Sequence, residues 1–219
     1  MPDPTAQQQD YVTAVHLAAI GESGFALAGA GAIRAHGLTD RPTQDIDLFG
    51  GPTVTADDFS VVLQRGEDAL RAAHYTVTRV REFPLFTRMR VTSPDGAMLD
   101  VDFAINWRAD PPVQMSVGPV LSERDAVAGK LSAVYSRGEV RDFLDLDAIR
   151  TSGRYTDPEL IALGHEHDDG FDAAMFAQQL SRVIHIYPSE AAEYGITEQA
   201  LDNMKRRIMN WAILLRDSS

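Results

Sequence analysis

The spacing of apolar and polar residues divides the chain into a mixed first half and a helical second half. In the first half, apolar residues recur at helical spacing over residues 6–20 and 56–74. Shorter apolar runs, bounded by turn-forming residues, predict strands. The predicted strands are Phe25–Ala28, the segment around Asp45–Phe49, Tyr75–Val80, Phe86–Thr92 and Ala97–Ile105. A hairpin turn over Ser93–Gly96 is expected between the last two, and a short helix is expected over Ala30–His36.

From Glu123 onward the pattern is helical throughout. The predicted helices are Arg124–Arg137, Val140–Thr151, Pro158–Gly164, Asp172–His185 and Thr197–Arg216. A run of mixed elements followed by a run of helices is typical of an α+β domain joined to a helical one. We therefore expect a core domain over residues 1–108 and a helical C-terminal domain over residues 109–219.

Composition narrows the possible functions. The 219 residues include no cysteine, which excludes disulfides and thiolate catalysis. No apolar run is long enough to span a membrane, and the polar N-terminus does not resemble a secretory signal, so a cytoplasmic protein is expected. The net charge of −12 argues against broad, non-specific binding of nucleic acid. Arginines 79, 81, 88 and 90 on neighbouring predicted strands are candidates for a local basic patch, although strand arginines are also commonly solvated.

Two aspartates on one predicted strand suggest a metal site. Asp45 and Asp47 are separated by one residue, so on a strand both side chains project to the same face, while Ile46 and Leu48 face the core. Like charges at this spacing repel unless a hard divalent cation such as Mg²⁺ lies between them. Two-metal phosphoryl transfer uses such an arrangement, and Asp100 or Asp102 on a neighbouring strand offers a third carboxylate. The alternative is a solvated polar strand face.

A glycine-rich turn precedes this pair. In Gly29-Ala30-Gly31 the turn follows a buried strand and opens a short helix, so backbone N–H groups are available to bind phosphate. Alone, such a turn is more often a simple tight turn. Its combination with the aspartate strand within some twenty residues favours a phosphate site beside a metal site.

At this point the sequence resembles a known family. Gly29-Ala30-Gly31-Ala32-Ile33 and the segment from Arg41 to Phe49 are similar to the first motif of AbiEii/AbiGii-type nucleotidyltransferases, the toxins of bacterial toxin–antitoxin pairs, which include the MenT toxins. The segments 125–130 and 141–146 resemble the family's later motif, a helix lysine followed by an Arg-Asp pair. The resemblance implies a polymerase-beta-like mixed sheet with flanking helices, followed by a helical domain.

The resemblance also implies roles for individual residues. Asp45 and Asp47 would hold Mg²⁺ or Mn²⁺, and Asp102 would be the third carboxylate and help to deprotonate the acceptor, with Asp100 in reserve. Lys130 would neutralise charge on the triphosphate and Asp142 would position Lys130 or the nucleotide. The remaining nucleotide-binding positions implied are Gly29, Ala30, Gly31 and Arg41. Ala30 stands where many members carry serine, which removes one hydroxyl contact to phosphate.

The reaction implied is transfer of NMP from an NTP to a hydroxyl, with release of pyrophosphate. The expected acceptor is a tRNA 3′ end, and the expected partner is a cognate antitoxin. Two alternatives remain. The acceptor is a small molecule or a protein side chain, and the acidic charge favours a cationic small molecule; or the chain is a catalytically silent module that binds nucleotide or a partner.

Overall fold

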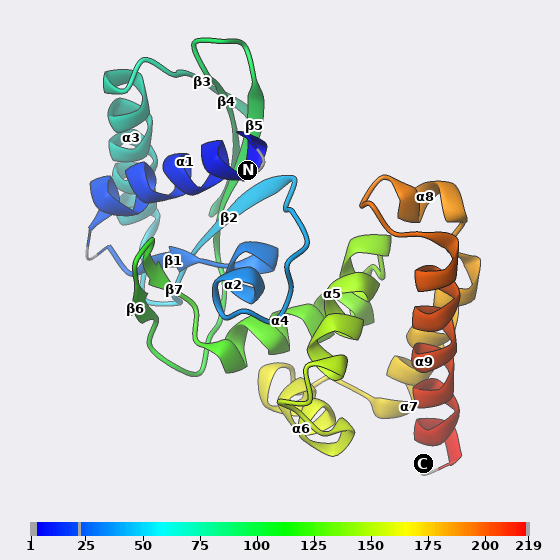
Figure 1. The fold of residues 1–219 in the computed structure, drawn as a ribbon. Coiled ribbons are helices and arrows are strands. Elements are labelled where there is room, and N and C mark those ends of the chain that lie inside the picture. The colour runs from blue at the N-terminus through cyan, green and yellow to red at the C-terminus, as the bar shows by residue number, and fades with distance from the viewer. Residues whose placement is uncertain (1–3, 22, 218–219) are drawn as a thin grey trace. The chain divides into compact units, whose positions relative to one another are not determined.

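The computed structural model describes residues 4–21 and 23–217, which fold into two compact units (Figure 1). Unit 1 comprises Met1–Ala35 and Pro42–Ser122, and unit 2 comprises His36–Arg41 and Glu123–Ser219. The first three residues of the polar N-terminus, on which the expected lack of a secretory signal partly rests, lie outside the described residues. None of the described helices is both long enough and apolar enough to cross a membrane.

A seven-stranded mixed sheet forms the centre of unit 1, in the order β3-β4-β5-β2-β1-β7-β6. β2 and β5 are parallel, as are β1 and β7, whereas the other neighbouring pairs are antiparallel. The strands are β1 (Phe25–Leu27), β2 (Asp45–Gly50), β3 (Thr76–Phe83), β4 (Phe86–Thr92), β5 (Met98–Ile105), β6 (Val113–Met115) and β7 (Gly118–Val120). This confirms the predicted α+β fold.

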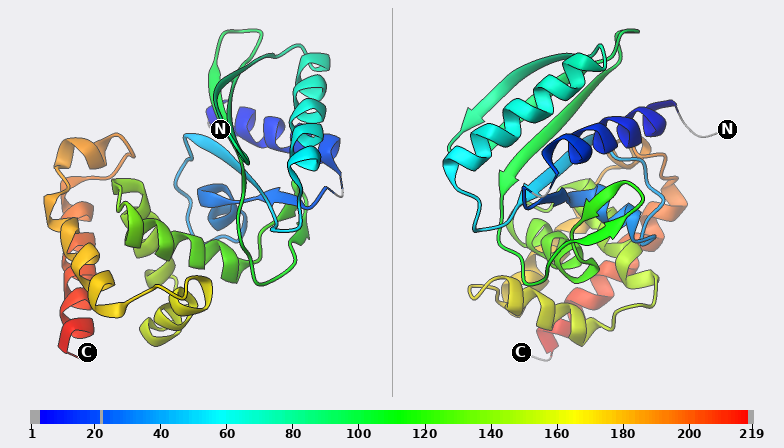
Figure 2. Two further views of the ribbon diagram at one scale, coloured as in Figure 1. Left: turned by 180° about the vertical axis from the view of Figure 1, so that it is seen from behind. Right: turned by 90° about the vertical axis from the view of Figure 1, so that its left-hand side faces the viewer.

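Two long helices cover one face of this sheet. They are α1 (Pro4–Ile20) and α3 (Ala56–Ala72), which pack against each other (Figure 2). The sheet contributes Phe25 and Phe103 to this layer, and α3 adds Phe59. Burial of these large apolar side chains determines which face of the sheet the two helices cover. α3 begins at a capping box in which the Thr55 hydroxyl accepts a hydrogen bond from the Asp58 backbone N–H. The short helix α2 (Gly29–Ala35) follows β1 and contacts β2.

Unit 2 is helical. Its elements are α4 (Glu123–Ser136), α5 (Val140–Thr151), α6 (Asp157–His167), α7 (Ala173–Ser181), a 3₁₀ turn over Arg182–His185, α8 (Pro188–Ala192) and α9 (Glu198–Asp217). α4 contacts α5, α6 and α7, and α7 packs along α9. Phe143, Phe176 and Trp211 are fully buried here, and the edge of Phe176 contacts the ring of Trp211. Unit 2 therefore has a hydrophobic core formed by its own residues.

The predicted elements agree with the structure to within a few residues, with four exceptions. β6, β7 and α8 were not predicted, and α6 continues to His167, beyond its predicted end at Gly164. The two added strands extend the first sheet to residue 120, so the compact units divide at 122, and residues 36–41 join the helical unit.

Candidate active site

Four aspartates lie in register on adjacent strands of unit 1. β2 and β5 pair so that Asp45 is opposite Asp100 and Asp47 is opposite Asp102. Residues two apart on a strand share a face, so all four carboxylates project from the side of the sheet away from α1 and α3. On β2 the burial alternates as predicted, because Ile46 and Leu48 are buried and the two aspartates are only partly so. The result is a compact block of negative charge.

Two arginines on β4 neutralise part of this block. Arg88 donates to both carboxylate oxygens of Asp102, each at 2.6 Å, and Arg90 donates to those of Asp100 at 2.9 and 3.0 Å. The hydrogen bonds that Arg88 donates to Asp102, helped by the charges of Asp102, Asp100 and Asp45, raise the pKa of Arg88 despite partial burial. Within residues 4–21 and 23–217, no three carboxylate or imidazole groups converge as a ready-made metal site. In this conformation, Asp100 and the predicted third carboxylate, Asp102, are each held by an arginine.

The glycine turn touches the second of these aspartates. Gly29 has φ +55°, and a Cβ built on it would lie 1.8 Å from Asp47 Oδ2, so no side chain fits between turn and carboxylate. The Ala28 N–H donates to the Asp47 carbonyl at 2.8 Å, which ties the turn to β2. A Cβ on Gly31 would lie 2.8 Å from Leu27 Cδ1, and the side chain of Ala30 is buried. At these three positions only backbone groups could bind phosphate.

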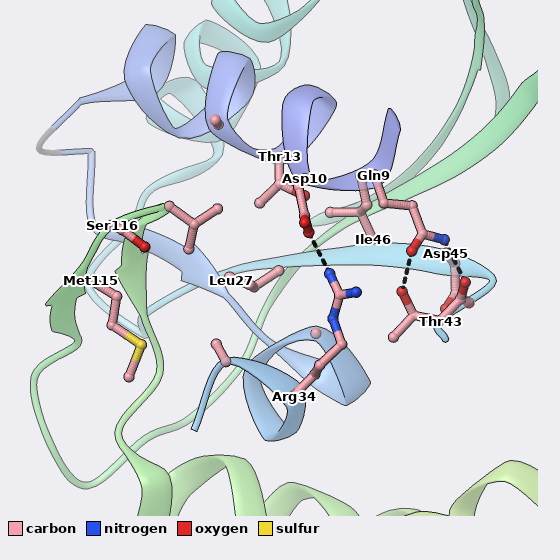
Figure 3. A pocket seen from close by; sticks show the side chains of 14 residues that line it. Gln9, Asp10, Thr13, Leu27, Arg34, Thr43, Asp45, Ile46, Met115 and Ser116 are labelled. Carbon is pink, nitrogen blue, oxygen red and sulfur yellow. Dashed lines mark hydrogen bonds and ion pairs between the residues drawn. The ribbon is translucent and has the colours of Figure 1, made fainter. Parts of the chain in front are cut away.

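A cavity of about 510 Å³ opens beside Asp45 (Figure 3). Its walls come from α1, α2, the start of β2 and the segment after β6. The Thr43 hydroxyl donates to Gln9 Oε1 at 2.8 Å next to Asp45, and Arg34 forms an ion pair with Asp10 across the cavity. The cavity is thus lined by both apolar and polar side chains, and Asp45 is one of the latter.

In unit 2, Lys130 lies in a buried ionic cluster. Its side chain is 7% exposed, and Nζ lies 2.8 Å from Asp145 Oδ2 and 3.6 Å from Asp142 Oδ1. Asp142 accepts two hydrogen bonds from Arg137, at 2.8 and 3.0 Å, and one from the Glu139 backbone N–H. Burial raises the pKa of Asp142, but the hydrogen bonds from Arg137 and the nearby cations outweigh it, so that the pKa is lowered. The Lys130 ammonium is thus fixed by two carboxylates.

The same cluster includes Arg41. Its guanidinium donates to both oxygens of Asp145 at 2.9 Å and lies over the ring of Tyr194, 5.4 Å from its centroid. The structure therefore places Arg41 with the helical unit rather than with the carboxylate strand.

Comparison with known families identifies the chain. The model of the "Nucleotidyl transferase AbiEii toxin, Type IV TA system" family matches residues 16–210, which is most of the sequence. The chain belongs to the AbiEii family. This AbiEii protein is therefore a nucleotidyltransferase and the toxin of a type IV toxin–antitoxin system, for which an NTP is the donor and an antitoxin the partner. No curated protein matches the chain.

Solved structures share the fold of the AbiEii chain. JHP933 from Helicobacter pylori is 15% identical, with a TM-score of 0.63, over 99% of this chain and 94% of that one. MenT4, a nucleotidyltransferase toxin from Mycobacterium tuberculosis H37Rv, is 17% identical, with a TM-score of 0.63, over 95% of this chain and 84% of that one. At this level of identity the likeness concerns the fold alone.

Sequence reasoning overlooked Asp145 and Arg88. Asp145 was interpreted as solvated, yet it is fully buried and contacts Lys130 more closely than the predicted Asp142 does. Asp142 and Asp145 are three residues apart on α5, so their common helix face was a signal. Arg88 was interpreted only as part of a possible basic patch. Counting outward from the Ser93–Gly96 turn would have placed Arg88 opposite Asp102 and Arg90 opposite Asp100.

Proposed function

We propose that this AbiEii toxin transfers NMP from an NTP to the 3′-terminal hydroxyl of tRNA, using Mg²⁺ or Mn²⁺ bound by Asp45, Asp47 and Asp102. The observation that carries the proposal is the parallel register of β2 and β5, with Asp47 beside Asp102. Carboxylate oxygens are the ligands that hard divalent cations prefer. The tight approach of Gly29 to Asp47 fits the same reaction, because it brings unshielded backbone next to the carboxylate that binds the cation.

Each residue has a proposed task. When bound, the cation neutralises triphosphate charge and makes the acceptor hydroxyl more acidic. Asp45 and Asp47 bind the cation, and Asp102 accepts the proton of the acceptor hydroxyl. The backbone of Gly29, Ala30 and Gly31 binds phosphate oxygens.

In unit 2, the proposed task of Lys130 is to neutralise charge on the triphosphate. Asp145, 2.8 Å from its Nζ, fixes the ammonium group, and Asp142 supports it from 3.6 Å. Asp142 also stabilises the start of α5 by accepting from the Glu139 N–H. These two carboxylates are therefore positioning residues for Lys130.

A second acceptor class has one observation in its favour. Arg79, Arg88 and Arg90, three members of the possible basic patch, each form an ion pair with a carboxylate. Together with the net charge of −12, this leaves little free positive charge on β3 and β4 to attract RNA phosphates. A cationic small molecule or a protein side chain is therefore the second candidate acceptor.

The test uses each α-labelled NTP with Mg²⁺ and either total tRNA, an aminoglycoside or a protein extract. The proposal predicts label on tRNA with the wild type, none with Asp47→Ala, and normal transfer with Asp57→Ala, an exposed carboxylate of the same unit. Label only on the small molecule or on protein would replace the tRNA acceptor. Absence of label from all acceptors would contradict the proposed reaction. In cells, induced expression of the wild type, but not of Asp47→Ala, is expected to arrest growth.

A further inference from the structure

Two parallel rows of charge cross three strands of unit 1. One row contains Arg88 on β4, Asp102 on β5 and Asp47 on β2, and the other contains Arg90, Asp100 and Asp45. Cross-strand neighbours on one face have Cβ atoms roughly 4.5–5.5 Å apart, so each side chain can reach the next one in its row. The rows have the same composition and differ only in geometry and in the roles proposed for their aspartates.

The row of Arg88 is the tighter of the two. Arg88 approaches both oxygens of Asp102 to 2.6 Å, whereas Arg90 approaches those of Asp100 only to 2.9 and 3.0 Å. The Asp102 side chain is 10% exposed and that of Asp100 is 23% exposed. Ion pairs are strengthened when water is excluded, so the Arg88 pair is the less screened by solvent.

This pairing conflicts with binding of a cation by Asp102. A divalent cation shared by Asp47 and Asp102 would lie close to the guanidinium, and two positive groups at one carboxylate repel each other. Both oxygens of Asp102 already accept hydrogen bonds from Arg88, so a cation at this carboxylate would share them with the guanidinium. The carboxylate therefore binds either Arg88 or the cation with full strength, but not both.

We propose that Arg88 is a positioning residue that sets the cation affinity of the site by competing with the cation for Asp102. This inference rests on the proposed metal-dependent function. In the metal-free protein Arg88 holds Asp102 and offsets the mutual repulsion of the aspartates. Binding of a cation between Asp47 and Asp102 displaces the guanidinium, so part of the binding free energy is used to break the Arg88 pair.

Equilibrium binding of Mn²⁺, without NTP or acceptor, tests the competition. Arg88→Met is expected to bind Mn²⁺ about 10-fold more tightly than the wild type, the size of effect typical of groups that contact metal ligands. The matched control is Arg90→Met, which removes the same charge from the neighbouring row and is expected to change affinity by about 2-fold at most. A residue with a purely structural role would weaken binding on substitution, so a gain is diagnostic.

Two further variants keep the test decisive. Arg88→Lys preserves the positive charge but loses the bidentate contact with Asp102. This variant should fold even if Arg88→Met does not. Its Mn²⁺ affinity is expected to rise less, by roughly 3-fold. Adding Asp102→Asn to either Arg88 variant should abolish the gain, because the group competed for is then neutral. Thermal unfolding of each variant in EDTA confirms that the compared proteins are folded.

The outcomes separate this inference from the proposed function. Loss of Mn²⁺ binding in Asp47→Asn without any gain in the Arg88 variants would refute the role of Arg88 and leave the metal site standing. An equal gain in Mn²⁺ affinity in Arg90→Met would also refute the role of Arg88, because removing any nearby positive charge would then have the same effect. Mn²⁺ binding that is unchanged in Asp47→Asn would contradict the metal site and this inference together.

Discussion

Replacing Gly29 by alanine should disable the site while leaving most of the fold intact. Gly29 has φ +55°, and an alanine Cβ there would lie 1.8 Å from Asp47 Oδ2. Because carbon atoms of side chains are essentially never closer than 3.0 Å to such a neighbour, the carboxylate has to retreat by about 1 Å. Displacements of that size in a catalytic group reduce rates by roughly 100-fold. We expect a comparable loss of transfer rate and a clearly weaker affinity for Mn²⁺.

Gly21→Ala is the matched control. Gly21 has φ +54°, nearly the same backbone conformation, but none of the described atoms lies within 4 Å of its added Cβ. Both substitutions place an L-residue in the left-handed region, which costs about 1–2 kcal/mol. Gly29→Ala carries an additional cost of about 1 kcal/mol for moving the Asp47 side chain out of its preferred rotamer. Urea unfolding should therefore show a modest difference between the two variants.

Transfer of label from α-labelled NTP and equilibrium binding of Mn²⁺ are then compared in the two variants. Gly21→Ala is expected to behave as the wild type in both assays, since its added Cβ does not contact any of the aspartates of β2 and β5. Wild-type activity and Mn²⁺ affinity in a folded Gly29→Ala protein would refute the claim that a Cβ at this position displaces the Asp47 carboxylate. Equal losses in both variants would refute it too, because backbone strain and not the contact with Asp47 would then be responsible.

Two further predictions concern stability. His16 is fully buried, and loss of hydration lowers its pKa from 6.5 to about 4. Between these two pH values the imidazole is protonated in the unfolded chain but neutral in the folded one. The free energy of unfolding should therefore fall by about 3 kcal/mol as the pH drops through this window. Urea unfolding at pH 7 and 4 measures this, and an unchanged pH dependence in His16→Gln would contradict it. Asp145→Asn leaves Arg41 and Lys130 buried without their shared carboxylate, so a loss of about 3–5 kcal/mol is expected. Asp157→Asn, which breaks a more exposed pair, should cost about 1 kcal/mol or less, and equal losses would argue against the buried cluster.

The long elements could be predicted from sequence because their patterns are strong. The alternation around Asp45 and Asp47 fixed a strand whose apolar residues face α1 and α3, and the Ser93–Gly96 turn fixed the hairpin that follows. The strands β6 and β7 have three residues each, and α8 has five, so none is long enough to show a period. Such short elements form because neighbouring elements supply their partners, as β1 does for β7.

Pairings between distant residues were harder to predict. The contact of Lys130 with Asp145 depends on how α4 and α5 pack, and that of Arg41 with Asp145 joins residues 104 positions apart. Helical periodicity gives the face of each residue but not the partner helix. The candidate carboxylates, by contrast, lie on regular strands, where period-two alternation was sufficient to put Asp45 and Asp47 on one face.

The most direct test of the account measures Mn²⁺ binding and label transfer in parallel for the wild type, Asp45→Asn, Asp47→Asn and Asp102→Asn. Each substitution is expected to weaken both properties, Asp47→Asn is expected to abolish them, and EDTA is expected to stop transfer by the wild type. Transfer that persists in EDTA, or in a folded Asp47→Asn protein, would show that the aspartates of β2 and β5 do not carry the reaction.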